Sequence, residues 1–506
     1  MMQKLWLIPV LFSLACLTAL TAAAKKKTFV YCSEGSPKLF NPQLATDGVT
    51  FNASSTAVYS RLVEFAVGTT EIIPGLAEKW NVSKDGKRYT FYLRKDVSFH
   101  RTDFFRPKRK FNADDVVFTF HRQLKKDHPY HNVNGGTYEY FVAMGMDKLI
   151  TSVKKIDDHT VEFTLAKPEA PFLANLAMDF ASILSAEYAE QQLKAGKPQE
   201  VDFKPVGTGP FVFRKYVKDT VIRYRANEEY FRGKPAIDRL IYAITPDASV
   251  RYQKLKAKEC HLIAEPAPTD LATMKQNANI KVMQQAGLNV GYVAMNVEKK
   301  PFNNVYVRRA IHHALNRQSY IQAIYLGNAE VAKNPIPPTI WSYNTNIKDY
   351  EYDLEKAKQL LKKAGYPDGF TTNLWWLKIS RPYNPDGKKM ATLIKADLEK
   401  IGITVNLRTF EWAEYLKRAR AGEHAMLQLG WTGDNGDPDN FLHTLLGCAA
   451  VRSGSNTARW CDSSFDKLVM QAKRTADQQQ RSALYQKAQE IFKRQAPWVP
   501  IAHSTV

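Results

Sequence analysis

Apolar residues after Gly287 recur first at strand spacing and then at helix spacing. Residues 290–295 read as a buried strand, and a helix is indicated after it by Val307, Ala310, Ile311, Ala314 and Leu315. The pattern then repeats: one helix begins at Asp353, a second is marked by Met390, Ile394, Leu398 and Ile401, and strands are expected at 374–379, 403–407 and 425–429. Strands that alternate with helices are typical of an α/β fold. We therefore predict an α/β lobe over residues 287–506.

Two polar and aromatic segments follow strands of this lobe: Ser380-Arg381-Pro382-Tyr383 and Gly430-Trp431-Thr432-Gly433-Asp434. In open α/β sheets the ligand crevice lies beyond the carboxyl ends of the strands, so both segments fall where a ligand would bind. Taken alone, Arg381 before a proline also suits a solvated loop, and Trp431 and Tyr383 also suit a core. The position in the fold, rather than the residue types, makes these segments candidates.

Metal sites are not indicated. A calcium-binding loop is a possible interpretation of three nearby aspartates, Asp434, Asp437 and Asp439. Their spacing does not fit Asp-x-Asp-x-Asp-Gly, however, and the closing glutamate is absent. The sequence contains neither Cys-x-x-Cys nor His-x-x-x-His spacing, so a zinc site is not predicted either.

The first half of the chain is rich in strand signals. Residues 27–31 and 160–165 read as strands, and Asp85-Gly86 separates two further runs as a hairpin turn would. Asn112 stands where an N-cap would, ahead of Asp114-Asp115 and an apolar run. The segment Gly207-Thr208-Gly209-Pro210-Phe211 is a tight break, which suits either a hinge between domains or an ordinary glycine turn.

With 506 residues, the chain is too long for one hydrophobic core, and two or three domains are expected. The formal net charge of +21 is unusual, but the lysines and arginines are dispersed along the chain and form no basic run. We interpret the charge as a solvated surface with some attraction for anionic ligands or membranes. Nucleic-acid binding is not predicted.

The first residues resemble a cleavable signal peptide. Lys4 precedes an apolar run to Leu20, and Ala22-Ala23-Ala24 offers a small-residue cleavage site before Lys25. We therefore expect residues 1–24 to be removed and the chain to be exported. The run is too short for a membrane-spanning helix. Cys16 raises a lipoprotein alternative, but the residue three positions earlier is serine and apolar residues continue past the cysteine, so a lipid anchor is not expected.

Four cysteines remain after cleavage: Cys32, Cys260, Cys448 and Cys461. An even number in an exported chain indicates two disulfides, for which sequence allows three pairings. The pair nearest in sequence, Cys448 with Cys461, closes a short loop and leaves Cys32 with Cys260.

The chain is similar to a known family along nearly its whole mature length. It resembles the peptide-binding class of periplasmic extracellular solute-binding proteins, family 5, which includes dipeptide-binding and haem-binding receptors. Each matching motif is weak alone, but together and in order they are specific: residues 31–36 (YCSEGS), 73–80 (IPGLAEKW), 112–118 (NADDVVF), 205–211 (PVGTGPF), 245–252 (TPDASVRY), 381–385 (RPYNP) and 430–441 (GWTGDNGDPDNF). Residues 335–343 look similar to the haem-binding member.

The resemblance implies a two-lobed α/β fold with an extra inserted domain and a hinge. Residues 25–60 and 208–286 would form a discontinuous lobe I, 61–207 the inserted domain II, and 287–506 lobe III. A Cys32–Cys260 disulfide suits that plan, since both residues fall in lobe I. Family members are expected to continue beyond residues 502–504 and return to lobe I, whereas this sequence stops at Val506.

The resemblance also implies a function and a set of contacts. The chain is expected to be a periplasmic, monomeric receptor without a cofactor, which delivers dipeptides or other short peptides to an inner-membrane ABC permease. Asp434 is expected to pair with the α-ammonium group of the peptide and Arg381 with its α-carboxylate. The residues expected around the peptide backbone are Thr46, Pro382, Tyr383, Trp431, Thr432 and Gly433.

The sequence also bears on two other functions. An enzyme is disfavoured, because the sequence has no Gly-x-Ser-x-Gly elbow, no His-Glu-x-x-His motif and no phosphate-binding glycine loop. A haem-binding or glutathione-binding receptor of the same fold is the main alternative. No axial haem ligand stands out, since surface or core positions are expected for His100, His121, His312, His313, His424 and His443.

Overall fold

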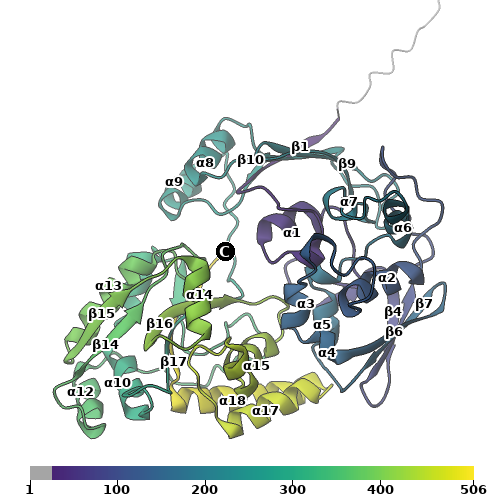
Figure 1. Cartoon of the computed structure of the whole chain (residues 1–506). Helices are drawn as coiled ribbons and strands as arrows, with labels where there is room; N and C mark the ends of the chain where they lie inside the picture. The colour runs from purple at the N-terminus through teal and green to yellow at the C-terminus, as the bar shows by residue number, and fades with distance from the viewer. Residues whose placement is uncertain (1–25) are drawn as a thin grey trace, which may run out of the picture.

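The computed structural model describes residues 26–506, so the predicted signal peptide, residues 1–24, and Cys16 lie outside the described residues. The chain is built around three larger β-sheets, each with its own helices (Figure 1). Among the described helices, none is both long and apolar enough to cross a lipid bilayer.

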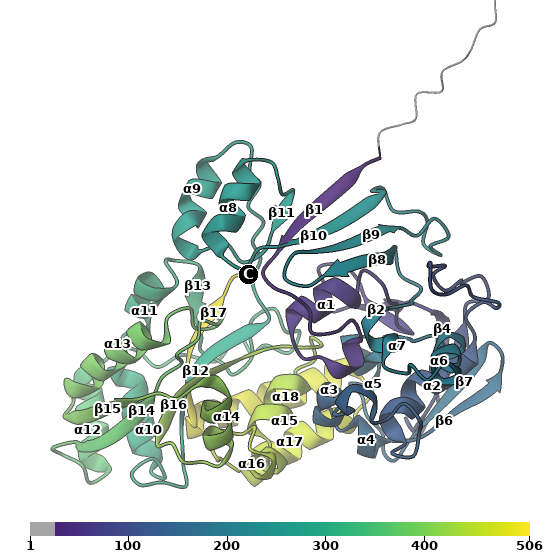
Figure 2. The same ribbon diagram turned by 45° about the horizontal axis from the view of Figure 1, so that its top comes forward.

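The first sheet joins the start of the described chain to its middle. Its five strands are ordered β11 (Leu262–Ile263), β1 (Thr28–Ser33), β10 (Arg239–Ile244), β9 (Val221–Ala226) and β8 (Phe211–Val217). Strand β1 is parallel to both neighbours, β10 and β11. Figure 2 shows this sheet above helix α1 (Gly48–Ser54), with α8 (Ala248–Lys256) and α9 (Leu271–Gln276) at its far edge.

Cysteine pairing ties this sheet together. Cys32 lies in β1, and Cys260 lies just before the neighbouring β11, with their Cα atoms 5.8 Å apart. The second disulfide joins Cys448 to Cys461 in the last third of the chain. Both predicted pairings are confirmed.

The second sheet belongs to the intervening segment. Its order is β4 (Ala77–Val82), β5 (Arg88–Leu93), β7 (Thr160–Leu165) and β6 (Ile150–Asp157), and a separate pair is formed by β2 (Val63–Phe65) and β3 (Ile72–Pro74). The predicted hairpin at Asp85-Gly86 and the strand at 160–165 are confirmed. The helices of this segment are α2 (Ala113–Leu124), α3 (Glu139–Ala143), α4 (Met146–Leu149), α5 (Phe172–Leu176), α6 (Ala186–Lys194) and α7 (Glu200–Phe203).

Helix α2 begins where the sequence predicts. The side chain of Asn112 accepts a hydrogen bond from the backbone nitrogen of Asp114, and the Asp115 carboxylate accepts one from the backbone nitrogen of Asn112 at 3.0 Å. This reciprocal arrangement satisfies donors that an α-helix leaves unpaired in its first turn.

A buried ion pair fixes the intervening segment to the start of the chain. Arg122 binds both carboxylate oxygens of Asp202 at 2.9 and 2.8 Å, and both side chains are fully buried. Asn41 and Asn134 each donate to the same carboxylate at 2.7 Å. Because Asn41 precedes the segment that holds the other three residues, this network joins the two parts of the molecule.

The third sheet is mixed and has six strands. Its order is β13 (Ala329–Val331), β17 (Trp498–Ser504), β12 (Asn289–Met295), β16 (Met426–Thr432), β14 (Phe370–Trp375) and β15 (Ile403–Arg408). Strands β14, β15 and β16 are parallel, whereas β12 is antiparallel to β16 and β17. Strand β17 was not anticipated from the sequence, and its Trp498 stacks on Tyr292 of β12 with ring centres 3.7 Å apart.

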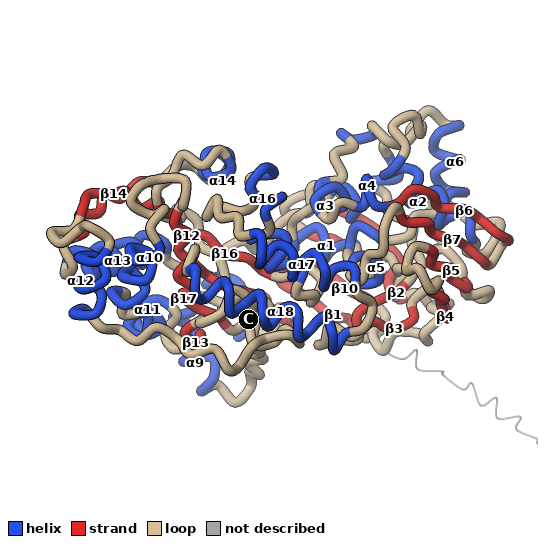
Figure 3. The backbone as a smooth tube through the Cα atoms, turned by 90° about the horizontal axis from the view of Figure 1, so that it is seen from below, coloured by secondary structure: helices blue, strands red, loops and turns tan. Residues whose placement is uncertain are grey.

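Helices cover both faces of this sheet, as Figure 3 shows from below. One core contains residues of α10 (Val305–Ala314), α11 (Arg317–Ile324), α12 (Leu354–Lys363) and α13 (Gly387–Glu399). The other contains residues of α14 (Trp412–Arg420), α15 (Asp439–Leu446), α17 (Ser463–Arg474) and α18 (Gln478–Gln495), and the short α16 (Cys448–Ser453) follows α15. The predicted α/β architecture is confirmed.

Two predicted strand limits differ from the structure. The strand expected at 374–379 spans Phe370–Trp375, because its parallel partner β15 pairs with it from Phe370↔Ile403 to Trp375↔Arg408 and then ends. The strand expected at 425–429 continues to Thr432, because β12 pairs with it as far as Asn289↔Thr432. In both cases the neighbouring strand determines the length.

Candidate functional site

The two candidate segments lie at the same edge of the third sheet. Strands β14 and β16 are adjacent and parallel, so their carboxyl ends point the same way. The 381–383 segment lies between β14 and α13, and Gly433 and Asp434 follow β16 directly. Such an edge is the usual place for a ligand in an α/β sheet.

A pair of glycines makes room for Tyr383 on this edge. Gly291 of β12 and Gly430 of β16 stand directly opposite each other. A Cβ atom at Gly430 would lie 2.1 Å from Cδ2 of the Tyr383 ring, and one at Gly291 would lie 2.3 Å from the Tyr383 carbonyl oxygen. The same carbonyl accepts a hydrogen bond from the Tyr325 hydroxyl at 2.7 Å. The sheet therefore fixes the loop that carries Arg381.

Among the described residues, the Arg381 side chain contacts the Trp412 ring and the Tyr383 hydroxyl and binds no carboxylate. Its guanidinium carbon lies 4.6 Å from the ring centre of Trp412, a cation–π contact. Among the described residues, Arg381 forms no ion pair. The positive charge of Arg381 also influences Glu265, which follows strand β11 of the first sheet. Burial raises the pKa of Glu265, and Arg381 partly offsets that rise. An arginine with aromatic support and no bound carboxylate suits recognition of an anion.

Asp434 is an acid without a cation. Asn440 donates to its carboxylate at 3.1 Å, and the hydroxyl of Tyr140 in α3 also bonds to it. Among the described residues, no lysine or arginine pairs with it. Burial is the largest influence and raises the pKa of Asp434 to about 6, although the two hydrogen bonds act in the opposite direction. A positively charged ligand group would supply the missing partner.

Asn440 organises the loop around Asp434. Its side-chain oxygen accepts from the indole nitrogen of Trp431 at 2.9 Å and from the backbone nitrogen of Asp434 at 3.0 Å. Gly433 is also constrained, because its backbone nitrogen donates to Leu288 at 2.6 Å and a Cβ atom there would lie 2.7 Å from the Phe441 ring. The loop is thus preorganised.

The remaining predicted contacts lie around these loops with different exposure. Thr432 and Pro382 are exposed, and the Pro382 carbonyl accepts from the Ser504 hydroxyl at 2.9 Å. Thr46 is exposed and directly precedes Asp47, the N-cap of α1. None of the described hydrogen bonds, ion pairs or ring contacts joins Thr46 to the loops of the third sheet.

Sequence reasoning missed Tyr140 and gave no role to Asn440. Asn440 lies inside the matching motif at 430–441, so a contact between its polar side chain and Asp434 could have been predicted. Tyr140 reaches Asp434 from the intervening segment. No local pattern could have indicated a contact over that separation.

Two of the aspartates considered for a calcium loop bind basic side chains of the protein. Asp437 binds the Arg481 guanidinium at 2.8 and 2.9 Å, and Asp439 binds the Lys473 ammonium at 3.0 Å. Protein cations therefore already neutralise both carboxylates. Within residues 26–506, no group of three or more His, Cys, Asp or Glu side chains is placed to hold a metal ion.

The six histidines considered as haem ligands are engaged in hydrogen bonds. Backbone carbonyls accept from the rings of five of them at 2.7–3.1 Å: His100, His121, His312, His313 and His424. The sixth, His443, lies 3.4 Å from the Lys473 ammonium and 3.8 Å from the Asp439 carboxylate. Burial lowers its pKa.

Comparison with known proteins identifies the family of the chain. Residues 71–453 match the family described as bacterial extracellular solute-binding proteins, family 5 Middle. The chain belongs to this family. Its members are solute-binding proteins, and the similarity extends well beyond the matched region.

Two curated relatives span almost the whole chain. The dipeptide-binding protein of Escherichia coli (strain K12) is 55% identical, over 97% of this chain and 92% of the relative. Heme-binding protein A of Haemophilus influenzae is 53% identical, over 96% of this chain and 89% of the relative.

A solved structure extends the comparison to three dimensions. The dipeptide-binding protein from Pseudoalteromonas sp. SM9913, in complex with Met-Leu, is 41% identical. The match has a TM-score of 0.81 and covers 95% of this chain and 94% of that one. The fold predicted from the sequence, a two-lobed binding-protein fold, is therefore confirmed.

Proposed function

We propose that this chain is the substrate-binding component of an ABC-type uptake system, and that it binds dipeptides by their charged termini and delivers them to an inner-membrane permease. The observation that carries the proposal is the pair of unpartnered charges on one sheet edge. Within residues 26–506, Asp434 forms no ion pair with a cation and Arg381 forms none with a carboxylate, although the residues around both are fixed. A zwitterionic peptide supplies the two missing charges at once.

The assignment of roles follows from charge. Asp434 receives the α-ammonium group, and Arg381 receives the α-carboxylate in the bidentate geometry that guanidinium groups favour. Thr46, Pro382, Tyr383, Trp431, Thr432 and Gly433 surround the peptide backbone. Because the two charges are held at a fixed separation, they select peptide length, while wet side-chain pockets tolerate different residues.

The division of the strands among three sheets supports a division of the chain into three structural units. Strands of the first sheet come only from 25–60 and 208–286, those of the second from 61–207, and those of the third from 287–506. We assign these ranges to lobe I, domain II and lobe III. Closure of lobe I on lobe III would remove both ligand charges from water. Loss of either protein counter-charge would then leave a buried ligand charge unpaired and weaken binding strongly.

The decisive experiment is a calorimetric titration of four combinations. The unaltered protein and the Asp434→Asn variant are each titrated with a dipeptide and with its N-acetylated form. Loss of Asp434 is expected to cost about 2–5 kcal/mol with the free dipeptide. Acetylation should cost the unaltered protein much more than the variant, because the variant has already lost the partner of the ammonium group. Equal losses in both proteins would refute the role of Asp434.

Two further arms separate the alternatives. If the protein binds dipeptides without hydrolysing them, incubation with a dipeptide releases no free amino acids. The appearance of free amino acids would show that the protein is a peptidase. The relative named heme-binding protein A makes haem the second ligand to test. A stoichiometric change in the haem absorption spectrum, with no heat from dipeptides, would favour that alternative.

A further inference from the structure

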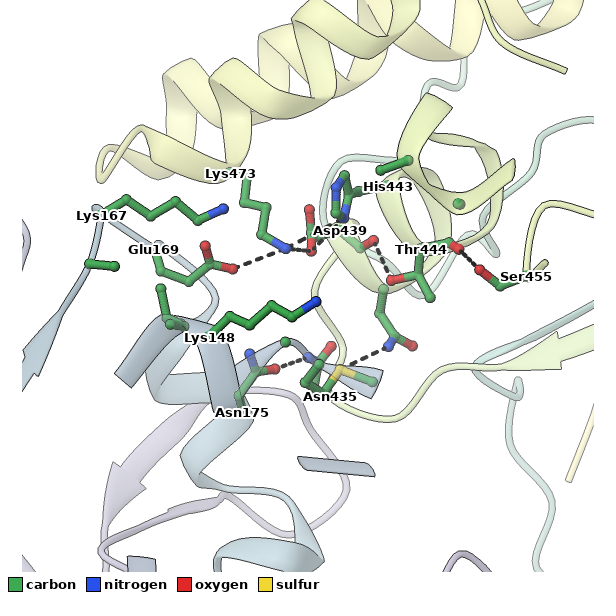
Figure 4. Close-up of a pocket in the computed structure, with 17 residues that line it drawn as sticks. Lys148, Lys167, Glu169, Asn175, Asn435, Asp439, His443, Thr444, Ser455 and Lys473 are labelled. Atoms are coloured by element: carbon green, nitrogen blue, oxygen red, sulfur yellow. Dashed lines mark hydrogen bonds and ion pairs between the residues drawn. The ribbon is translucent and has the colours of Figure 1, made fainter. Parts of the chain in front are cut away.

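A second cavity lies between domain II and lobe III. Its volume is about 400 Å³, within the range of small-molecule sites. One wall comes from α4, α5 and the loop that follows β7, and the other from α15, α16 and α17. Figure 4 shows the side chains that line it.

The cavity is separate from the sheet edge that holds Arg381. The two regions meet at Asn440, which bonds to Asp434 on one side and lies 3.9 Å from the Met144 sulfur on the other. Neither Asp434 nor Arg381 lines the cavity.

Two lysines of domain II extend toward the cavity without a carboxylate partner (Figure 4). Lys148 of α4 and Lys167, which follows β7, are both exposed and both line the cavity. Over the described part of the chain, neither ammonium group forms an ion pair. Two unpaired cations on one wall favour an anion.

The acidic side chains of the cavity are already compensated. Lys473 lies between Glu169 and Asp439, 3.0 Å from each carboxylate. Burial raises the pKa of Glu169 to about 7, whereas the pKa of Asp439 is lowered by Lys473 against the effect of burial. Both acids are therefore held by Lys473, and neither is paired with Lys148 or Lys167.

The rest of the lining favours an organic ligand. Met144, Leu149, Ala166 and Ala449 supply apolar surface, and Thr444 supplies a hydroxyl group. A dipeptide fits less well, because its ammonium group would face two free lysines and find both acids already paired. The cavity therefore differs in charge from the zwitterion site.

We propose that this cavity is a second binding site, which holds a small organic dianion such as a dicarboxylate or a phosphate monoester between Lys148 and Lys167. The ligand would rest against lobe III while its charged groups contact domain II. Both candidate chemistries share two negative charges on a short carbon skeleton, and separate titrations distinguish them.

The test is calorimetry of the full-length mature protein at low ionic strength, with glutarate and with glycerol 3-phosphate as probes. At least one probe should bind saturably at one site, and added salt should weaken it. Lys148→Ala and Lys167→Ala should each weaken that binding about tenfold, the loss of one charge-assisted contact. Lys154→Ala removes an exposed lysine of β6 outside the cavity and should leave the affinity unchanged.

A variant that fills the cavity tests the site independently of charge. Ala449 is exposed and lines the cavity, so Ala449→Trp should abolish probe binding while the protein remains folded. Arg381→Ala should bind the probe normally, which separates this site from the proposed dipeptide site. The proposal is overturned if neither probe binds saturably, if Lys154→Ala weakens binding as much as the cavity variants, or if Ala449→Trp binds like the unaltered protein.

Discussion

Replacing Asp434 with asparagine is expected to stabilise the ligand-free protein at alkaline pH. Burial raises the pKa of this carboxyl from 3.8 to about 6. One pKa unit corresponds to about 1.4 kcal/mol, so the ionised carboxylate costs the fold about 1–3 kcal/mol once its partial exposure is allowed for. Asparagine removes the charge but keeps an acceptor for Asn440 and Tyr140. The variant should therefore gain most of that free energy of unfolding.

The sign of the effect depends on pH. Because the folded-state pKa lies above the unfolded one, the cost is fully present above pH 6 and disappears as pH falls toward 3.8. Urea unfolding followed by circular dichroism should show the variant to be more stable at about pH 8 and equal to the unaltered protein at about pH 4.

Ligand adds a second readout to the same experiment. A saturating dipeptide should raise the stability of the unaltered protein, because it binds only the folded state, and should raise that of the variant far less. Asp96→Asn is the control, since Asp96 is an exposed loop residue and such changes shift stability by about 0.5 kcal/mol or less. An Asp434→Asn variant that is less stable at both pH values would refute the reasoning that Asp434 is a buried, uncompensated charge.

Other substitutions probe the scaffold and the export signal. Gly430→Ala should lower the free energy of unfolding by about 1–3 kcal/mol and weaken dipeptide binding in calorimetry, because its Cβ would displace Tyr383. Gly48→Ala is the control and should change neither quantity, because a Cβ atom there meets nothing within 4 Å. Asp202→Asn should cost about 3–5 kcal/mol in urea unfolding, because it leaves a buried guanidinium uncompensated, and a cost below 1 kcal/mol would contradict this. Mass spectrometry of the exported protein should find residues 1–24 removed, and their retention would exclude a cleaved signal.

Local signals in the sequence were sufficient to place many elements. Asn112 and Asp353 act as N-caps at the predicted helix starts, since capping depends only on residues within one turn. The strand at 403–407 was found because its apolar residues alternate. The limits of β14 were missed because the neighbouring strand sets them, and that information is not local.

The candidate site was predictable in part for the same reason. Arg381 and Asp434 follow strands whose carboxyl ends share an edge, and this much follows from the order of elements. The lack of an ion pair at either residue within 26–506 could not be predicted from the sequence, because it depends on which side chains fold around them. The role of Tyr140 required the placement of domain II against lobe III.

The position of β17 inside the third sheet, one strand from its edge, determines when that sheet can be completed. This strand lies between β12 and β13, which leave the ribosome well before residues 498–504 do. Until those residues are available, β12 and β13 each keep an unpaired edge, and Tyr292 lacks the indole that stacks on it. Pairing between strands so distant in sequence forms slowly. The third sheet can therefore close only when residues 498–504 pair with β12 and β13, which makes it depend on the most distant strand pairing in this part of the chain.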